Sequence, residues 1–422
     1  MELTKEKVES IREQFPAFSR KVNGIQAKFF DGPAGTQVPI RVAEAMTEYL
    51  FHFNANHDGL FQTAVESDER LELAHRAMAE FLGVDDPDEV SFGQNMTSLT
   101  FAFSRALSTE WKEGDEIIVT RLDHDANVTP WVRAATDRGV KVHYVEFDSD
   151  SFELKLDQLE GFLSPRTKLV AVGCASNASG GINPVRKICE MAHAVGALCY
   201  VDAVHYAPHR LIDIPEFGCD FLVCSAYKFF GPHTGIFWGK RELLERLPAY
   251  KVRPAPDSIP GKWMTGTQSH ESIMGTVAAV DYLADIGRDL AGDNKLDRRS
   301  ALGAAYSAIE NYEQRLADQF LDGFSATPGL KVYGCTEKGR PDKRVSTFSI
   351  TLDSVQTDHL AQQLCDLGHF VWHGHYYALQ FTESLGLEPQ GMVRIGALHY
   401  NTADEVDQLI KDLHVIASPK LV

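Results

Sequence analysis

Short apolar runs alternate with helix-length stretches between about residues 65 and 280, and this alternation restricts the possible folds most strongly. A strand that is apolar along its whole length is typical of a sheet with both faces covered by helices. The alternation therefore predicts an α/β fold with a mostly parallel, seven-stranded sheet, in which ligands bind at the carboxyl ends of the strands. The predicted strands are residues 88–93, 116–120, 140–146, 168–173, 197–202, 220–225 and 235–239, and the predicted helices include 97–108, 127–138 and 185–195.

The connection between the last two predicted strands, from Lys228 to Gly235, is too short for a helical crossover. One strand of that pair is therefore expected to run antiparallel to the other. The Pro- and Gly-rich residues 254–266 predict an ordered loop that leaves the sheet. A helix is expected near 271–287, followed by a polar, charged run at 288–300.

A second, smaller α/β unit is predicted after about residue 300. Thr402, with Glu405 three residues later, predicts a capped helix start. We expect residues 51–290 to form a large domain, residues 291–422 a small C-terminal domain, and residues 1–50 a segment that packs with the small domain. The expected elements of the small domain are helices at 300–320, 358–367 and 402–415 and strands at 345–352 and 392–397.

Composition and charge limit the binding partners and the cellular compartment that we expect. The formal net charge of −18 argues against a nucleic-acid or anionic-membrane partner. The seven cysteines form no C-x-x-C pair, and several lie in strand-like runs, so we expect free thiols in a reducing compartment. The N-terminus is charged, and no apolar run reaches the length of a membrane span. We therefore predict a cytoplasmic protein.

Lys228 and Asp202 end two of the predicted strands. Burying a lysine is costly because desolvation disfavours the ammonium, unless the amine is kept neutral for covalent work such as a Schiff base. A lysine for an aldehyde and an acid for a ring nitrogen are what pyridoxal phosphate requires. In isolation, the lysine is also explained as a solvated turn residue and the aspartate as a structural one.

Four further residues have side chains suited to binding or catalysis. His124 follows a strand, where an imidazole can stack on a flat ring or move protons, although a surface histidine is equally consistent. Thr97 begins a helix and Ser225 precedes Lys228 by three residues, so both can help to bind a phosphate, or serve as plain helix caps. Arg394 lies within an apolar strand and needs an anion, either a substrate carboxylate or an internal partner.

Together these residues resemble the class V branch of fold-type I pyridoxal-phosphate enzymes, which includes cysteine desulfurases, selenocysteine lyase and isopenicillin N epimerase. The resemblance runs nearly from end to end. It is carried by Phe29-Phe-Asp-Gly-Pro-Ala34, Asp123-His-Asp-Ala-Asn-Val-Thr-Pro-Trp131, Ser176-Asn-Ala-Ser-Gly180, Val201-Asp-Ala-Val-His205, Ser225-Ala-Tyr-Lys228, Gly266-Thr267 and Val393-Arg-Ile-Gly-Ala-Leu-His-Tyr-Asn-Thr402.

The resemblance implies a role for each matching residue. Lys228 would hold the cofactor aldehyde and move protons at Cα, Asp202 would pair with the pyridinium, and His124 would stack on the ring. Asn177 and His205 would lie near the ring hydroxyl, where desulfurases often carry a glutamine in place of His205. Thr97 and Ser225 would bind the phosphate, Thr267 would come from a second subunit, and Arg394 would bind the substrate carboxylate. The family is typically homodimeric, with active sites at the interface.

The departures from the family pattern bear on the reaction. Desulfurases carry a nucleophilic cysteine in a stretch like G-H-H-C-A, whereas this chain reads Gly374-His-Tyr-Tyr-Ala378, with Tyr377 in the cysteine position. Without that thiolate a protein persulfide cannot form by the usual route. The loop Phe53–Gly59 resembles the family's N-terminal active-site loop but lacks its arginine. We expect Asn56 in that loop, together with His375 and Tyr377, to contact the substrate.

The resemblance therefore implies an enzyme that binds an amino acid as an external aldimine and removes its Cα proton. Three outcomes stay open: β-elimination as in a C–S lyase, which we favour, transamination, or epimerisation.

Other classes of protein have weaker support in the sequence. Ser225-x-x-Lys228 matches the S-x-x-K of serine acyl-transfer enzymes, but the chain lacks S-D-N and K-T-G. Two further alternatives are a metal enzyme, using Asp202, His205 and His209 or His373 and His375, and a non-catalytic protein on an enzyme fold.

Overall fold

The computed structural model describes residues 2–353 and 355–418. Its central element is a seven-stranded sheet with the strand order β4-β10-β9-β8-β7-β5-β6. The strands from β9 to β6 are parallel, and β10 is antiparallel to both of its neighbours, as the short connection after Lys228 predicts. The strands are β4 (Val90–Gly93), β5 (Glu116–Thr120), β6 (Lys141–Val145), β7 (Thr167–Gly173), β8 (Leu198–Asp202), β9 (Phe221–Ser225) and β10 (Gly235–Gly239).

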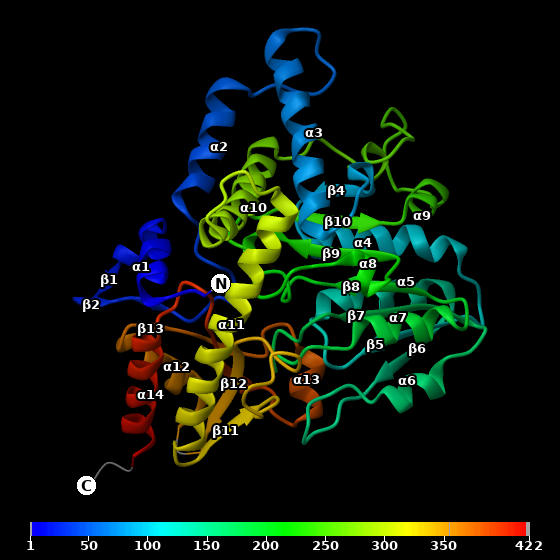
Figure 1. The fold of residues 1–422 in the computed structure, drawn as a ribbon. Coiled ribbons are helices and arrows are strands. Elements are labelled where there is room, and N and C mark those ends of the chain that lie inside the picture. Colours follow the sequence, from blue (N-terminus) through cyan, green and yellow to red (C-terminus); the bar gives the residue numbers. More distant parts are fainter. Residues whose placement is uncertain (1, 354, 419–422) are drawn as a thin grey trace.

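Both faces of this sheet are buried, which explains why its strands are apolar along their whole length. Along β5, Ile117 and Val119 belong to one hydrophobic cluster and Ile118 to another. The two clusters lie on opposite faces, because successive side chains of a strand point to opposite sides. The helices around the sheet are α3 (Gln62–Leu82), α4 (Met96–Leu107), α5 (Thr129–Arg138), α6 (Leu156–Phe162), α7 (Val185–His193), α8 (Ile214–Phe217) and α9 (Arg241–Arg246) (Figure 1).

Two long helices join the first sheet to the second unit: α10 (His270–Ala291) and α11 (Arg298–Ser325). Both helices are longer than expected and extend into the polar run at 288–300 from its two ends. Gly292 ends α10 in the left-handed conformation, and the Asp297 side chain caps α11 by accepting a hydrogen bond from Ser300 N. The helices meet so closely that a Cβ on Gly287 would lie 1.8 Å from the Ala301 carbonyl oxygen.

The second unit contains an antiparallel four-stranded sheet with the order β11-β12-β15-β14. Thr402 and Glu405 form the expected capping box at the start of its last helix. The strands are β11 (Leu330–Tyr333), β12 (Thr347–Leu352), β14 (Trp372–Gly374) and β15 (Met392–Gly396), and the helices are α12 (Thr357–Asp366), α13 (Leu379–Ser384) and α14 (Ala403–Ala417).

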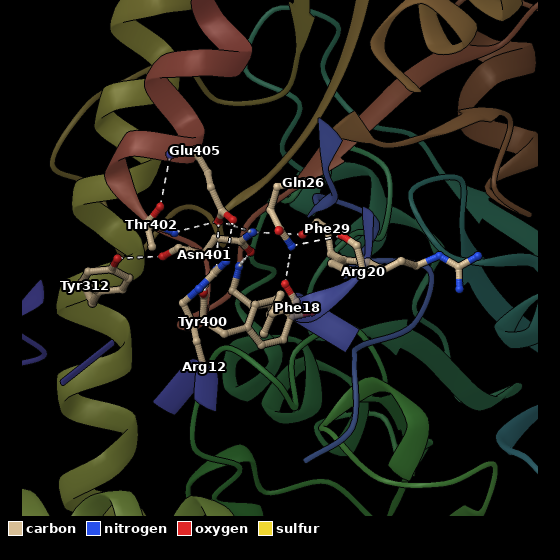
Figure 2. Close-up of polar contacts among 11 residues, drawn as sticks. Arg12, Phe18, Arg20, Gln26, Phe29, Tyr312, Tyr400, Asn401, Thr402 and Glu405 are labelled. Atoms are coloured by element: carbon tan, nitrogen blue, oxygen red, sulfur yellow. Dashed lines mark hydrogen bonds and ion pairs between the residues drawn. The ribbon is translucent and has the colours of Figure 1, made fainter. Parts of the chain in front are cut away.

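The N-terminal residues contact the second unit at two places. In α1 (Lys5–Glu13), Arg12 forms a bidentate ion pair with Glu405, with N–O distances of 2.7 and 3.1 Å (Figure 2). Strand β3 (Lys28–Phe29) pairs in parallel with β13 (His369–Phe370), and Asn401 donates to the Phe29 carbonyl. The next helix, α2 (Ile40–His52), packs instead against α10. The domain limits at residues 50 and 290 stay a prediction.

A short hairpin, β1 (Lys21–Val22) and β2 (Ile25–Gln26), precedes β3. None of the helices in the described ranges combines the length and apolar character needed to cross a bilayer.

Candidate active site

The carboxyl ends of β8 and β9 bring Asp202 and Lys228 to one crevice, as expected for neighbouring parallel strands. Asp202 is the last residue of β8, and Lys228 ends a short 3-10 turn that follows β9. Both side chains are buried and line a small cavity of about 50 Å³. Lys228 also lines a larger cavity of about 1000 Å³ that opens toward the second unit.

Lys228 is buried, and none of the described residues places a carboxylate in direct contact with it. Its Nζ donates to the Pro33 carbonyl oxygen, a partner that the sequence did not suggest. Burial lowers the pKa of Lys228 to about 7; the Arg394 charge lowers it further and Asp202 opposes the shift. A large fraction of this amine is therefore neutral near pH 7, which suits a nucleophile or a base.

Asp202 shares its surroundings with a second acid, Asp123. Burial raises the pKa of Asp202 to about 6, and Lys228 opposes this shift. Burial raises the pKa of Asp123 to about 7, although its carboxylate accepts hydrogen bonds from Gly173 N and Asn127 Nδ2, each at 2.9 Å. Asp123 also lines the small cavity. In the sequence, Asp123 is marked only by its position next to His124.

His124 is held in one tautomer. Its Nδ1 accepts a hydrogen bond from Ala126 N at 3.0 Å, so the proton of the neutral ring lies on Nε2. Burial lowers the pKa of His124 to about 3, with smaller contributions from Lys228 and Arg394. The ring stacks on Tyr377, with centroids 5.5 Å apart and planes 23° apart. The Tyr377 carbonyl also accepts a hydrogen bond from Asp125 N at 2.7 Å.

The start of α4 forms one wall shared by the two cavities. Thr97 lines both of them, and Ser225 accepts a hydrogen bond from Met96 N at 3.1 Å. Gly235, opposite Ser225 in the sheet, allows this close approach, because a Cβ there would lie 2.5 Å from the Asn95 carbonyl carbon. Backbone amides and hydroxyls at a helix start are suitable donors for a phosphate.

Arg394 reaches the large cavity from β15. Its Nη1 donates to the Asn177 carbonyl oxygen at 3.0 Å, and its Cζ lies 4.4 Å from the centroid of the Tyr376 ring. Burial lowers the pKa of Arg394 to about 10, so the guanidinium stays charged at neutral pH. Asn177 in turn donates to the Tyr376 carbonyl at 2.9 Å. The charge of Asp31 acts on Arg394, but no carboxylate of the described part of the chain forms an ion pair with it.

His205 lies on the small cavity beside Asp202. Its Nε2 is 3.1 Å from Thr347 Oγ1, and its Nδ1 is buried without a partner among the described residues. Burial holds the pKa of His205 well below its usual value, with His209 as the next contribution. His205 is therefore neutral.

Three predicted residues line neither cavity of this single chain: Asn56, Thr267 and Ser225. Asn56 and Thr267 are exposed, and Asn56 Oδ1 accepts a hydrogen bond from His57 N at 2.9 Å. The role of Thr267 in a second subunit stays a prediction. His375 and Tyr377 line the large cavity, and so do Tyr376 and Tyr227, which are not among the predicted site residues.

The residues present fit pyridoxal phosphate. A buried and partly neutral lysine lies near an acid, a neutral histidine is held in one tautomer, and a helix start offers donors for a phosphate. Two buried polar atoms, Asn177 Oδ1 and His205 Nδ1, have no protein partner in the described ranges, and both side chains line the small cavity. A ligand with polar groups at that point would satisfy both atoms.

A desulfurase-type thiol is missing from the lining of these cavities. All seven cysteines are free, and none of them lines the small or the large cavity in the described parts of the chain. Cys365 is in α12, and five others are fully buried. The described residues contain no group of three or more His, Cys, Asp or Glu side chains suited to a metal ion.

Comparison with known proteins decides the family. The family model for class V aminotransferases matches residues 28–409. The chain belongs to the class V aminotransferase family. A probable cysteine desulfurase of Halalkalibacterium halodurans is 31% identical to this family member over 420 residues, covering 96% of each chain. The aminotransferase-like protein FGM3 of Gibberella zeae is 30% identical, covering 97% of this chain and 98% of the relative.

Solved structures agree on the fold. The apo structure of a cysteine desulfurase from Thermococcus onnurineus NA1 superposes with a TM-score of 0.85 at 24% identity, covering 97% of this chain and 98% of the other. This class V family member therefore has the fold-type I architecture that its sequence predicts. Its family is one of pyridoxal-phosphate-dependent enzymes, and the chain is accordingly an enzyme of the lyase or aminotransferase kind.

Proposed function

We propose that this enzyme binds pyridoxal phosphate in the small cavity and at the start of α4. Lys228 would hold the aldehyde, Asp202 the ring nitrogen, and Asn177 and His205 the ring hydroxyl. Thr97 and Ser225 would hold the phosphate, together with Thr267 of a second subunit. The bound cofactor supplies an electron sink for the charge that develops at the substrate Cα.

We further propose β-elimination from an amino acid, as in a C–S lyase, as the reaction. One observation carries this proposal: the position expected for a desulfurase nucleophile is Tyr377, whose ring stacks on His124, while Lys228, Asp202 and Arg394 are all present. Elimination requires removal of a Cα proton and departure of a Cβ substituent, but no cysteine in the enzyme. The relatives named as desulfurases support sulfur as the leaving atom.

The protein side chains divide this work between them. The charged Arg394 guanidinium has donors to spare after its one bond to Asn177 O, and these would bind the substrate carboxylate. The neutral Lys228 amine would accept the Cα proton, and the Cβ–S bond would break with its electron pair on sulfur, which then takes up a proton. Hydrolysis of the released enamine gives a keto acid and ammonia, so that atoms and charge balance.

The test uses the purified enzyme reconstituted with pyridoxal phosphate and a panel of amino acids that carry a sulfur substituent at Cβ. Keto acid is measured with lactate dehydrogenase, and sulfide or thiol with a chromogenic disulfide. We expect equal amounts of both products, and none from Lys228→Ala. Thiol without keto acid would refute elimination, as would the absence of both products from every substrate.

Transamination is the second candidate, because one relative at 30% identity is called aminotransferase-like. The same enzyme incubated with an amino acid but without a keto-acid acceptor separates the two reactions. Build-up of pyridoxamine phosphate, with no thiol released, indicates an aminotransferase. Racemisation of the amino acid in deuterated water, without either product, would indicate an epimerase instead.

We propose a homodimer with shared active sites as the working form. The tip formed by the ends of α2 and α3 projects from the body of the molecule (Figure 1). It exposes large apolar side chains, among them Phe51 at 77%, Leu60 at 101% and Phe61 at 60%. Apolar groups gathered in this way favour an interface. Light scattering is expected to give twice the chain mass, and Phe61→Asp to give the mass of one chain; a wild-type monomer would refute the dimer.

We also propose a cytoplasmic location and no nucleic-acid partner. The free cysteines support a reducing compartment, and the net charge of −18 opposes binding to polyanions. Fractionation of the producing cells tests the first point, and a DNA mobility shift at low salt tests the second.

A further inference from the structure

A threonine from the four-stranded sheet reaches the site formed by the seven-stranded sheet. Thr347, the first residue of β12, is fully buried, and its Oγ1 lies 3.1 Å from Nε2 of His205. The two residues are 142 positions apart in the sequence. Thr347 lines neither cavity, so it acts on the site only through His205.

The chemistry of the pair limits what each atom can do. A neutral imidazole has one N–H donor and one acceptor nitrogen, and a threonine hydroxyl can serve either of them. Nδ1 is buried and has no protein partner in the described ranges, so a ligand in the small cavity would determine whether it donates or accepts a hydrogen bond. If Thr347 donates to Nε2, the proton of the ring must lie on Nδ1.

The surroundings keep the ring neutral and fixed. The His205 ring packs edge-on against His209, with centroids 5.5 Å apart, and His209 Nδ1 is 2.6 Å from the buried carboxylate of Glu313. Lys228, Arg394 and His124 also act on His205, and each disfavours a positive charge on it. His205 is thus neutral, and its hydrogen-bond partners determine which ring nitrogen donates and which accepts.

We propose that Thr347 is a positioning residue that donates to His205 Nε2 and so fixes the proton on Nδ1, making His205 a donor to the cofactor's ring oxygen. This inference rests on the proposed binding of pyridoxal phosphate. A hydrogen-bond donor at that oxygen stabilises negative charge on it. Without the donor, the ring oxygen of the cofactor is more basic. The pH at which the proton next to this oxygen is lost therefore rises.

The experiment follows the visible absorbance of the reconstituted enzyme as a function of pH. We expect Thr347→Val, which keeps the shape but removes the hydroxyl, to raise the midpoint of the absorbance change by about one pH unit, a tenfold change in the equilibrium constant. Thr347→Ser retains the hydroxyl and is expected to keep the wild-type midpoint. Thr347→Ala is a second hydroxyl-free variant with the same expected shift, should the valine protein not fold.

Two controls make the result specific. Thr351→Val is the same change on the same strand, but the Thr351 hydroxyl bonds to Tyr333 OH at 3.1 Å, so no shift is expected. In a His205→Gln background, where an amide has no tautomer to fix, Thr347→Val is expected to lose its effect. Such a loss shows that the threonine acts through His205 and not through general structure.

Each outcome has a separate meaning. A visible band with the same midpoint in wild type and in both hydroxyl-free variants would overturn the role of Thr347 and leave the proposed function intact. A shift of equal size in the His205→Gln background would also overturn it. The lack of any visible band in reconstituted wild type would overturn the proposed function, and this inference with it.

Discussion

The rings of His124 and Tyr377 lie nearly parallel, with centroids 5.5 Å apart, and the backbone on either side of them is joined by a hydrogen bond from Asp125 N to the Tyr377 carbonyl. Tyr377 adopts a left-handed backbone conformation, with φ at 61°, and its side chain is 68% exposed. The structure thus places a large ring between His124 and solvent.

Removing the Tyr377 ring is expected to lower kcat/KM by about two- to tenfold, because a stacked aromatic pair contributes about 0.5–1.5 kcal/mol. Tyr377→Ala tests this loss, and Tyr377→Phe, which keeps the stack, is expected to stay within about twofold of wild type. Tyr250→Ala, at another exposed tyrosine, is the control. Equal losses for the alanine and phenylalanine variants at position 377 would assign the effect to the hydroxyl instead.

Arg394→Lys is expected to raise KM for the amino acid by about 10- to 100-fold with a smaller change in kcat. A lysine cannot bind a carboxylate with two parallel hydrogen bonds. Steady-state kinetics measures the change, and Arg340→Lys, at a surface position that pairs with Glu337 and Asp342, is the control. An inhibitor without a carboxylate is expected to bind wild type and Arg394→Lys equally; weaker binding to the variant would argue for a structural role.

The pH dependence of the reaction follows from two groups. Lys228, with a pKa of about 7, must be neutral to accept a proton, and Asp202, with a pKa of about 6, must be ionised to pair with a ring nitrogen. Both requirements fail as the pH falls, so kcat, which reports the substrate-bound enzyme in which the amine is free, is expected to rise from pH 5 to pH 8. Stopped-flow or initial-rate measurements across that range check this, and a profile that stays flat below pH 7 would contradict both assignments.

Gly287→Ala is expected to destabilise the fold by about 1–3 kcal/mol, because its Cβ would overlap the Ala301 carbonyl where α10 crosses α11. Gly303→Ala is the matched control. A Cβ there meets no atom within 4 Å, and alanine favours a helix interior, so stability is expected to rise by up to about 1 kcal/mol. Urea unfolding of both variants gives the comparison. Similar stabilities would mean that the helices separate at little cost.

The sequence predicted the central sheet well, because strands buried on both faces leave an uninterrupted apolar signal. It also predicted the antiparallel β10 from the shortness of one connection. The ends of α10 and α11 were predicted poorly, since polar residues on the exposed side of a helix look the same as a polar loop. Gly292 and Asp297, which set those ends, are recognisable only once the helices are known.

Lys228, Asp202, His124 and Arg394 could be proposed from their positions next to apolar strands, and the structure gathers them around two adjoining cavities. The partners Pro33 and Thr347 could not. They lie 195 and 142 positions from the residues that they contact, and nothing local in the sequence encodes such a contact. Only the tertiary packing of the N-terminal segment and of the four-stranded sheet against the seven-stranded sheet creates them.

The bond from Arg394 to the Asn177 carbonyl has one consequence for regulation of affinity. Its guanidinium comes from the four-stranded sheet and its acceptor from a loop of the seven-stranded one. If Arg394 binds the substrate carboxylate as proposed, any force that parts the two sheets would also withdraw this guanidinium, and by thermodynamic reciprocity a bound carboxylate would resist their parting. We therefore expect ligand affinity and the cohesion of the two sheets to change together, because both depend on the same coupling.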